Sequence, residues 1–308
     1  MMRERFYELA SEALWNDERV AVVLADIGAG KIPEHPRRFN VGIREQLLIG
    51  VAAGLALERY RPIVHSYTPF LVERPYEQIK LDLGHQDAGA VLVSYGASYD
   101  ASTEGRTHQA PEDVDALAAL PGWTIEVPGH VDEAEQTLAG ALENDDRVYI
   151  RLTDETNEAP IDGRGLTVVR RGSADALFVL AVGPTLDPVL EATLDLDATV
   201  AYLSRVRPFD AEGLRAAVGG TDLVLVEPYL AGTSAGEVSA ALQNRPHRLL
   251  SLGVPLGEFR HYGTGSEHRA AHGLDARGIR TAIERFNDPL YECSAQPEEA
   301  LLHSCCRA

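Results

Sequence analysis

The chain has 308 residues, of which 45% are hydrophobic, and this length allows two domains of about 150 residues each. Its net charge of −19 argues against a nucleic-acid or anionic-membrane partner, because either would require a basic surface. No apolar run approaches 18 residues and the first residues lack the apolar core of a secretory signal, so we expect no membrane span and a cytoplasmic location.

The first predicted elements are a helix and a strand. Residues 2–16 have the apolar spacing of a helix, and residues 20–27 form an apolar run of strand length. This run contains Asp26 and continues into a Gly-Ala-Gly turn. A strand that is apolar on both faces and ends in such a turn is typical of a parallel sheet, whose carboxyl edge is where ligands bind.

The stretch from Arg37 to Gln46 opens a segment, residues 47–57, that consists almost entirely of Leu, Ile, Val, Ala and Gly. A helix that is apolar all round is predicted to be buried. Glu45 would lie in the first turn of this helix, where the helix dipole favours a carboxylate but burial demands a partner. Two interpretations are open: Glu45 caps backbone amides, or it hydrogen-bonds a ligand.

Residues 39–46 read Phe-Asn-Val-Gly-Ile-Arg-Glu-Gln. They resemble the Asn-x-Gly-Ile-x-Glu-Gln/His motif of the pyrimidine-binding domain of transketolases and 1-deoxyxylulose-5-phosphate synthases, which use thiamine diphosphate. The resemblance implies that Glu45 hydrogen-bonds a ring nitrogen of the cofactor's aminopyrimidine. Glu45 would thereby favour the tautomer that deprotonates the thiazolium carbon, so we expect it to be both catalytic and cofactor-binding.

A strand is predicted at residues 63–67, and a helix after it towards residue 84. From Tyr67 the chain reads Tyr-x-x-Phe-x-x-x-Arg-x-Tyr-Glu-Gln-Ile, which resembles the family's Phe-x-x-Phe-x-x-x-Arg-x-Phe-Glu/Asp-Gln-Ile pattern. The resemblance implies that Tyr67, Phe70 and Arg74 belong to the cofactor site, with both aromatic rings packed around the aminopyrimidine. A place in the ordinary core is the alternative for these rings.

The next predicted strand, residues 90–95, leads into a polar loop of the kind in which sites are built. The loop's Thr-His-Gln sequence, with His108 at its centre, resembles the family's Glu-Asp-Gly-x-Thr-His-Gln-x-x-Glu-Asp motif. The resemblance implies that His108 contacts substrate oxygens, as a catalytic and substrate-binding residue, and that Glu104 replaces the usual Asp of the same substrate site. Gly96 stands where sugar-phosphate transketolases often carry a histidine, which leaves the identity of the substrate open.

Strands and helices continue to alternate, with helices predicted at 110–119 and 131–143 and strands at 124–127 and 148–152. This alternation is typical of a doubly wound parallel sheet. Arg151 lies in a segment that matches the family's Tyr-x-Arg, and the resemblance implies that it binds a substrate phosphate. A salt bridge with a neighbouring acid is the alternative.

Residues 154–165 are polar and contain Pro160 and two glycines, which indicates a domain boundary. We therefore expect an α/β chain of two doubly wound domains: a pyrimidine-binding domain at 1–158 and a domain like the transketolase C-terminal domain at 166–308. Short motifs of the second part resemble that domain too. Beyond the boundary, strands are predicted at 176–182, 199–203, 223–226 and 249–253, and helices near 186–194, 211–218 and 236–242.

Transketolases hold the cofactor's diphosphate through Mg²⁺ with a Gly-Asp-Gly motif, and no Gly-Asp-Gly occurs in this sequence. A diphosphate needs a metal and a helix N-terminus, and a strongly acidic chain without them would repel it. We therefore expect thiamine diphosphate and Mg²⁺ to be held mainly by another polypeptide. The chain resembles the C-terminal subunit of a split transketolase, which pairs with a diphosphate-binding N-terminal subunit in a heterotetramer, with the active site at their interface.

The resemblance implies transfer of a two-carbon ketol unit from a ketose, in the family often phosphorylated, to an aldehyde. Three alternatives stay open: a decarboxylating relative, namely a deoxyxylulose-phosphate synthase half or the beta subunit of a 2-oxo-acid dehydrogenase; a transketolase-like enzyme of specialised metabolism; and a non-catalytic scaffold subunit. No metal ligands are predicted in this chain, since the spacing of Cys293, Cys305 and Cys306 fits no zinc site.

Overall fold

The computed structural model describes residues 1–260 and 262–288. The strands are β1 (Val20–Leu24), β2 (Arg38–Asn40), β3 (Arg61–Tyr67), β4 (Val91–Tyr95), β5 (Trp123–Glu126), β6 (Arg147–Arg151), β7 (Thr167–Arg170), β8 (Leu177–Val182), β9 (Ala198–Leu203), β10 (Arg205–Arg207), β11 (Asp222–Leu230) and β12 (Arg248–Val254). The α-helices are α1 (Met2–Asn16), α2 (Glu45–Leu57), α3 (Tyr76–Gln78), α4 (Asp113–Ala118), α5 (Val131–Leu142), α6 (Leu186–Ala192), α7 (Ala211–Ala217), α8 (Ala235–Ala241), α9 (Gly265–Ala271) and α10 (Ala276–Asn287). Two π-helical segments, η1 (Pro69–Glu73) and η2 (Ile79–His85), and two 3₁₀ segments, η3 (Ser102–His108) and η4 (Gly183–Thr185), complete the described elements.

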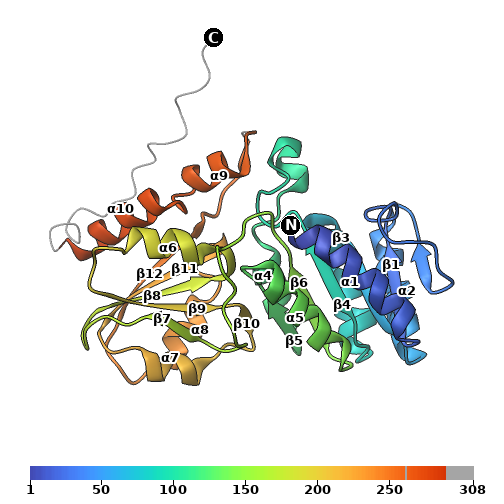
Figure 1. Ribbon diagram of the computed structural model, residues 1–308, viewed down its shortest axis with the longest axis horizontal. Coiled ribbons are helices and arrows are strands. Elements are labelled where there is room, and N and C mark those ends of the chain that lie inside the picture. Colours follow the sequence, from blue (N-terminus) through green and yellow to red (C-terminus); the bar gives the residue numbers. More distant parts are fainter. Residues whose placement is uncertain (261, 289–308) are drawn as a thin grey trace, which may run out of the picture.

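Two sheets flanked by helices lie side by side (Figure 1). The first has the order β10-β5-β6-β4-β3-β1-β2, and the second has the order β12-β11-β8-β9-β7. Neighbouring strands run parallel, except that the edge strands β10 and β7 run antiparallel to β5 and β9. The predicted α/β class with mostly parallel sheets is confirmed.

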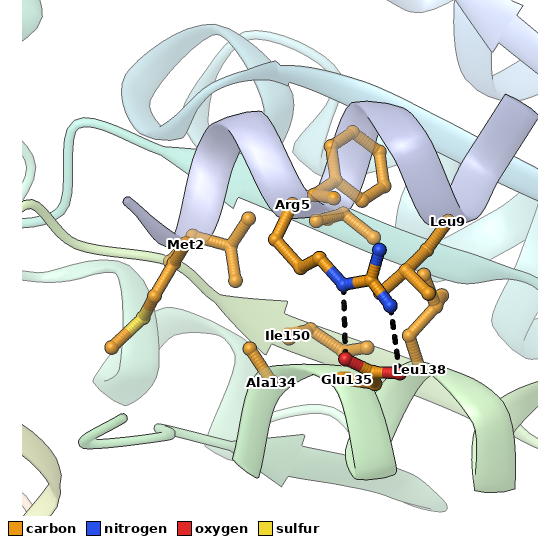
Figure 2. Close-up of a pocket in the computed structure, with 10 residues that line it drawn as sticks. Met2, Arg5, Leu9, Ala134, Glu135, Leu138 and Ile150 are labelled. Carbon is orange, nitrogen blue, oxygen red and sulfur yellow. Dashed lines mark hydrogen bonds and ion pairs between the residues drawn. The ribbon is translucent and has the colours of Figure 1, made fainter. Parts of the chain in front are cut away.

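Helices α1 and α5 cover one face of the first sheet, with Phe6 and Leu14 of α1 and Leu138 of α5 in one buried cluster. Figure 2 shows how Arg5 joins these two helices: its Nε and Nη2 each donate to one oxygen of Glu135, both at 2.9 Å. The apolar space beside this pair has a volume of only about 10 Å³, so it is a packing gap.

The other face of the first sheet shares a hydrophobic core with the second sheet. Ile125 of β5 and Val127 directly after it lie in the same buried cluster as Leu203 of β9 and Val206 of β10. Strand β10 lies beyond the predicted boundary at 154–165, yet it pairs with β5 of the first sheet. This strand physically couples the two halves of the chain.

The helix predicted at 47–57 forms as α2, but it is not buried all round. Leu48 and Ile49 are fully buried, whereas Leu47 is 49% exposed and Leu57 is 52% exposed. The expectation that this helix is buried on all sides was wrong for one of its faces. An apolar sequence predicts that a helix face will be covered, but it does not tell whether the same chain or another one covers it.

The helix predicted from Pro69 towards residue 84 is also interrupted. It divides into η1, the single turn α3 and η2. The division falls at Pro75, which has no backbone N–H to donate to a preceding turn.

Within the described ranges, no helix is long and apolar enough to cross a membrane. Cys293, Cys305 and Cys306 lie outside the residues that the structure describes, as does the end of the expected second domain.

Candidate active site

Residues predicted from separate motifs meet at the carboxyl edge of the first sheet. Tyr67 ends β3, Phe70 lies in η1 directly after it, and His108 ends η3, which follows β4. The ring centroids of Phe70 and His108 are 4.8 Å apart, and those of Tyr67 and His108 are 5.3 Å apart. The strands run parallel, so these loops emerge on one side of the sheet, where α/β proteins form their sites.

Glu45 is a buried carboxylate, 3% exposed, at the first residue of α2. Its Oε1 accepts a hydrogen bond from Nη1 of Arg74 at 2.9 Å. Within the described residues no backbone amide donates to this carboxylate, so the capping interpretation is not realised. The helix dipole favours the negative charge, while burial makes a partner necessary.

Arg74 is that partner, and its guanidinium also covers an aromatic face. Its Cζ lies 3.8 Å from the centroid of the Phe70 ring, in a cation–π contact. Its backbone carbonyl accepts a hydrogen bond from Nε2 of Gln46 at 3.1 Å. The side chain is 42% exposed, whereas that of Glu45 is 4% exposed. Arg74 therefore lies between Glu45 and Phe70, inside the predicted site.

The loop after β4 places the other predicted residues. His108 is half-buried, and its Nδ1 lies 3.0 Å from Oγ1 of Thr107. Glu104 is exposed, and its backbone carbonyl accepts from the same hydroxyl at 3.1 Å. Gln109, which follows His108, is 3% exposed, and its Nε2 has no partner among the described residues. This buried amide is a free donor beside the site.

Gly96 explains part of the loop's shape. Its φ is +99°, and a Cβ there would meet Cδ1 of Tyr67 at 3.0 Å. A histidine at this position would therefore be strained and would push against the Tyr67 ring. The backbone conformation at Gly96 and the nearby Tyr67 ring therefore both favour glycine over histidine at this position.

Sequence reasoning missed a contribution from the first helix. Arg3 of α1 lies over Tyr95, with its Cζ 3.9 Å from the ring centroid. The Tyr95 ring is 5.4 Å from that of Tyr67, and its hydroxyl donates to Oδ2 of Asp154 at 2.6 Å. The aromatic cluster thus extends from Phe70 towards an arginine and an aspartate. A sequence pattern could not reveal this, because only the tertiary fold brings α1 to this edge.

A group of carboxylates adjoins this extension. Asp100 accepts from Oγ1 of Thr153 at 3.1 Å and from the backbone N–H of Asp154 at 3.0 Å. Burial, and then the nearby charges of Glu155 and Asp154, raise the pKa of Asp100 to about 7.

Arg151 is buried and paired within the chain in this structure, and its expected role as a phosphate ligand stays a prediction. Its side chain is 1% exposed; Nε donates to Oδ2 of Asp113 at 2.8 Å and Nη2 donates to Oγ of Ser98 at 2.7 Å. The Ser98 hydroxyl in turn donates to the carbonyl of Pro228. The ion pair that the sequence left open is the one that forms. The hydrogen bonds through Ser98 connect β6 to Pro228 of the second sheet's strand β11.

Glu45 and the Phe70 ring offer contacts for a flat heterocycle that carries a protonatable nitrogen, and in this structure the guanidinium of Arg74 makes both contacts. Glu45 offers a carboxylate, and Tyr67 and Phe70 offer half-buried rings. The described residues contain no group of three or more side chains that could hold a metal ion.

The model of the transketolase pyrimidine-binding domain matches residues 1–157. An uncharacterized 33.6 kDa protein in the fasciation locus of Rhodococcoides fascians is 52% identical over 90% of this chain and 91% of its own length. The 1-deoxy-D-xylulose-5-phosphate synthase of Thioalkalivibrio sulfidiphilus is 32% identical over 82% of this chain. The match spans only 41% of that synthase.

Among solved structures, a split-gene transketolase described as an inactive beta4 tetramer superposes with a TM-score of 0.76. The alignment covers 92% of this chain and 97% of that chain at 24% identity. At this identity the likeness concerns the fold alone, and it extends over both sheets.

Proposed function

This chain belongs to the transketolase family through its pyrimidine-binding domain, and from that premise we propose that it supplies the pyrimidine-binding side of a two-subunit, thiamine-diphosphate-dependent ketol transferase. One observation carries the proposal. Glu45, a buried carboxylate at a helix N-terminus, lies beside the aromatic cluster at the carboxyl edge of a parallel sheet. The reaction is transfer of a two-carbon ketol unit from a ketose to an aldehyde.

In this proposal Glu45 holds and moves a proton at a ring nitrogen of the cofactor, while Tyr67 and Phe70 form aromatic walls for the same ring. Bound thiamine diphosphate would supply the carbon centre at which the bond next to the ketose carbonyl is cleaved. His108 donates a hydrogen bond or a proton to a substrate oxygen, and Glu104 accepts from a substrate hydroxyl. Arg151 acts only indirectly, by holding Ser98 and the start of the loop.

The diphosphate and Mg²⁺ are held by a partner subunit in this proposal. Two observations support it: the net charge of −19 and the outward face of α2, on which Leu47 and Leu57 are about half exposed. On this face Gly54 is exposed, and a Cβ added there would meet no atom within 4 Å. A helix of the partner could approach the backbone of α2 closely there.

A decarboxylating reaction is the second candidate. Deoxyxylulose-phosphate synthases are 32% and 35% identical to this chain over 82% of its length, and the burial of Arg151 removes one reason to expect a ketose phosphate. Pyruvate consumption with release of carbon dioxide would distinguish this reaction from ketose cleavage.

The test is to co-purify the chain with its diphosphate-binding partner and to assay ketoses, with and without phosphate, and pyruvate. We expect Glu45→Gln to reduce turnover at least about 100-fold while the complex still assembles, because the proton relay is removed. Glu135→Gln, which alters a partly exposed acid on α5, is the matched control and should leave turnover near that of the wild type. Near-normal turnover of the Glu45→Gln complex would refute the role of Glu45.

A further inference from the structure

We propose that Arg74 is a displaceable placeholder in the cofactor site: its guanidinium occupies the place of the cofactor's pyrimidine ring and swings into solvent when the ring binds. The inference rests on the proposed function. It also changes the role expected for Arg74, from a cofactor contact to a group that competes with the cofactor.

Two contacts of one guanidinium lead to this inference. Nη1 of Arg74 donates to the Glu45 carboxylate at 2.9 Å, and Cζ of Arg74 lies 3.8 Å from the Phe70 centroid. A ring that hydrogen-bonds Glu45 and packs against the same face of Phe70 needs the space that the guanidinium fills. The ring and the guanidinium therefore exclude each other.

The exposures of the two partners show which one can move. Glu45 is 4% exposed and fixed in the first turn of α2, while Arg74 is 42% exposed and has a path into solvent. The cofactor ring offers Glu45 a new hydrogen bond as Arg74 withdraws into solvent, so the carboxylate keeps a partner through the exchange. A buried carboxylate without any partner is unfavourable, so Arg74 keeps Glu45 satisfied until the ring arrives.

The local backbone confines the movement to the side chain. The N–H of Arg74 donates to the carbonyl of Pro69 at 3.2 Å, which closes the π-helical turn η1. The carbonyl of Arg74 accepts from Gln46, and Pro75 follows directly. With both of its backbone polar groups held, Arg74 can withdraw by rotation of its side chain alone.

A placeholder lowers the apparent affinity for the cofactor, because only the fraction of molecules with the arginine withdrawn can bind. The experiment is isothermal titration of the complete two-subunit complex with thiamine diphosphate at saturating Mg²⁺. Arg74→Met, which keeps an apolar stem and removes the guanidinium, should tighten the apparent Kd about fivefold. Arg5→Met, which removes a partly exposed arginine from the pair with Glu135, should leave the Kd unchanged.

A second readout uses the chain without its partner. Arg74→Met should lower the Tm in a Glu45 background and leave it nearly unchanged in a Glu45→Gln background, since only the charged carboxylate needs the cation. If Arg74→Met does not fold, Arg74→Lys takes its place in the titration with thiamine diphosphate. Lys keeps the charge but loses the planar contact with Phe70, so the apparent Kd should again tighten.

The outcomes separate the two proposals. A wild-type complex that does not bind thiamine diphosphate refutes the proposed function and this inference with it. If the wild type binds, an unchanged or weaker affinity of the Arg74 variant overturns the placeholder and leaves the proposed function standing. Weaker binding would specifically mark Arg74 as a direct ligand of the cofactor.

Discussion

At the scale of single residues, burial decides which charged side chains can meet a ligand. Arg151 and Arg74 were both expected to do so from their motifs. Arg151 is 1% exposed and paired with a fully buried aspartate, whereas Arg74 is 42% exposed and pairs with Glu45. The first ion pair is part of the core, and the second can open.

The Arg151 pair yields a stability prediction. Arg151→Met leaves the carboxylate of Asp113 buried without a cation, so the free energy of unfolding should fall by about 3 kcal/mol. Adding Asp113→Asn should recover part of this loss. Denaturant unfolding of both variants measures the effect. Unchanged stability together with a raised KM for phosphorylated substrates would instead restore the substrate role of Arg151.

Asp100 yields a pH prediction. Its folded-state pKa of about 7 lies above the ordinary value of 3.8, so the folded chain keeps a proton there that the unfolded chain releases. The stability from this group is present below the ordinary pKa and is lost as the pH rises towards 7. Glu155 and Asp154 nearby reinforce the shift, and Arg151 opposes it.

Asp100→Asn removes this titration and keeps a side-chain acceptor. Relative to the wild type, the variant should gain at least about 1 kcal/mol of unfolding free energy between pH 5 and pH 8. Denaturant melts at the two pH values test this, and a gain that is the same at both values would contradict it.

At the scale of elements, α2 has two different faces. Leu48 and Ile49 point into the core of this chain, and Leu47 and Leu57 point outward. Because the outward face is proposed to contact the partner, Leu57→Glu should weaken association with the diphosphate-binding subunit at least about tenfold and leave the fold of this chain intact. Titration of the two subunits measures the affinity.

Leu194→Glu is the control for that prediction. Leu194 follows α6 and is 79% exposed, so it matches Leu57 in chemistry but lies far along the chain, among the elements of the second sheet. If both substitutions weaken association equally, or neither does, α2 is not the contact surface.

Elements with strong patterns could be predicted from the sequence, and short or interrupted ones could not. The apolar runs of the central strands, such as β1 and β8, have strand length and end in turn residues, which favours buried parallel strands. Strands β2 and β10 have three residues each, too few for a periodic signal.

The candidate site divides in the same way. Tyr67, Phe70 and His108 could be predicted because each lies in a motif at the end of a predicted strand, and the parallel sheet brings such ends together. The position of Arg3 over Tyr95 could not, because it depends on how α1 docks on α5. Nor could the pairing of Arg151, since burial of both partners is a property of the folded chain.

At the scale of the whole molecule, we propose a division into domains at 1–158 and 166 onward. Strand β10 crosses this division, because it belongs to the second part and pairs with β5 in the first sheet. The hydrogen bond from Ser98 to Pro228 and the one from the Leu230 N–H to the Pro111 carbonyl cross between the two parts. These hydrogen bonds hold the loop that carries His108 of the candidate site. The second part thus supports the position of that loop, although it contributes none of the proposed catalytic residues.

Strand β10 has a consequence for the order in which the protein can form during synthesis. Its pairing of Arg205 with Glu126 and of Arg207 with Ile125 closes the edge of the first sheet at β5. As the chain leaves the ribosome from its N-terminus, that edge stays open until residue 207 has emerged, after three strands of the second sheet have already been made. Until then, the backbone N–H and C=O groups on the outer edge of β5 have no strand to pair with. The strand that pairs with them, β10, follows three strands of the second sheet in the sequence.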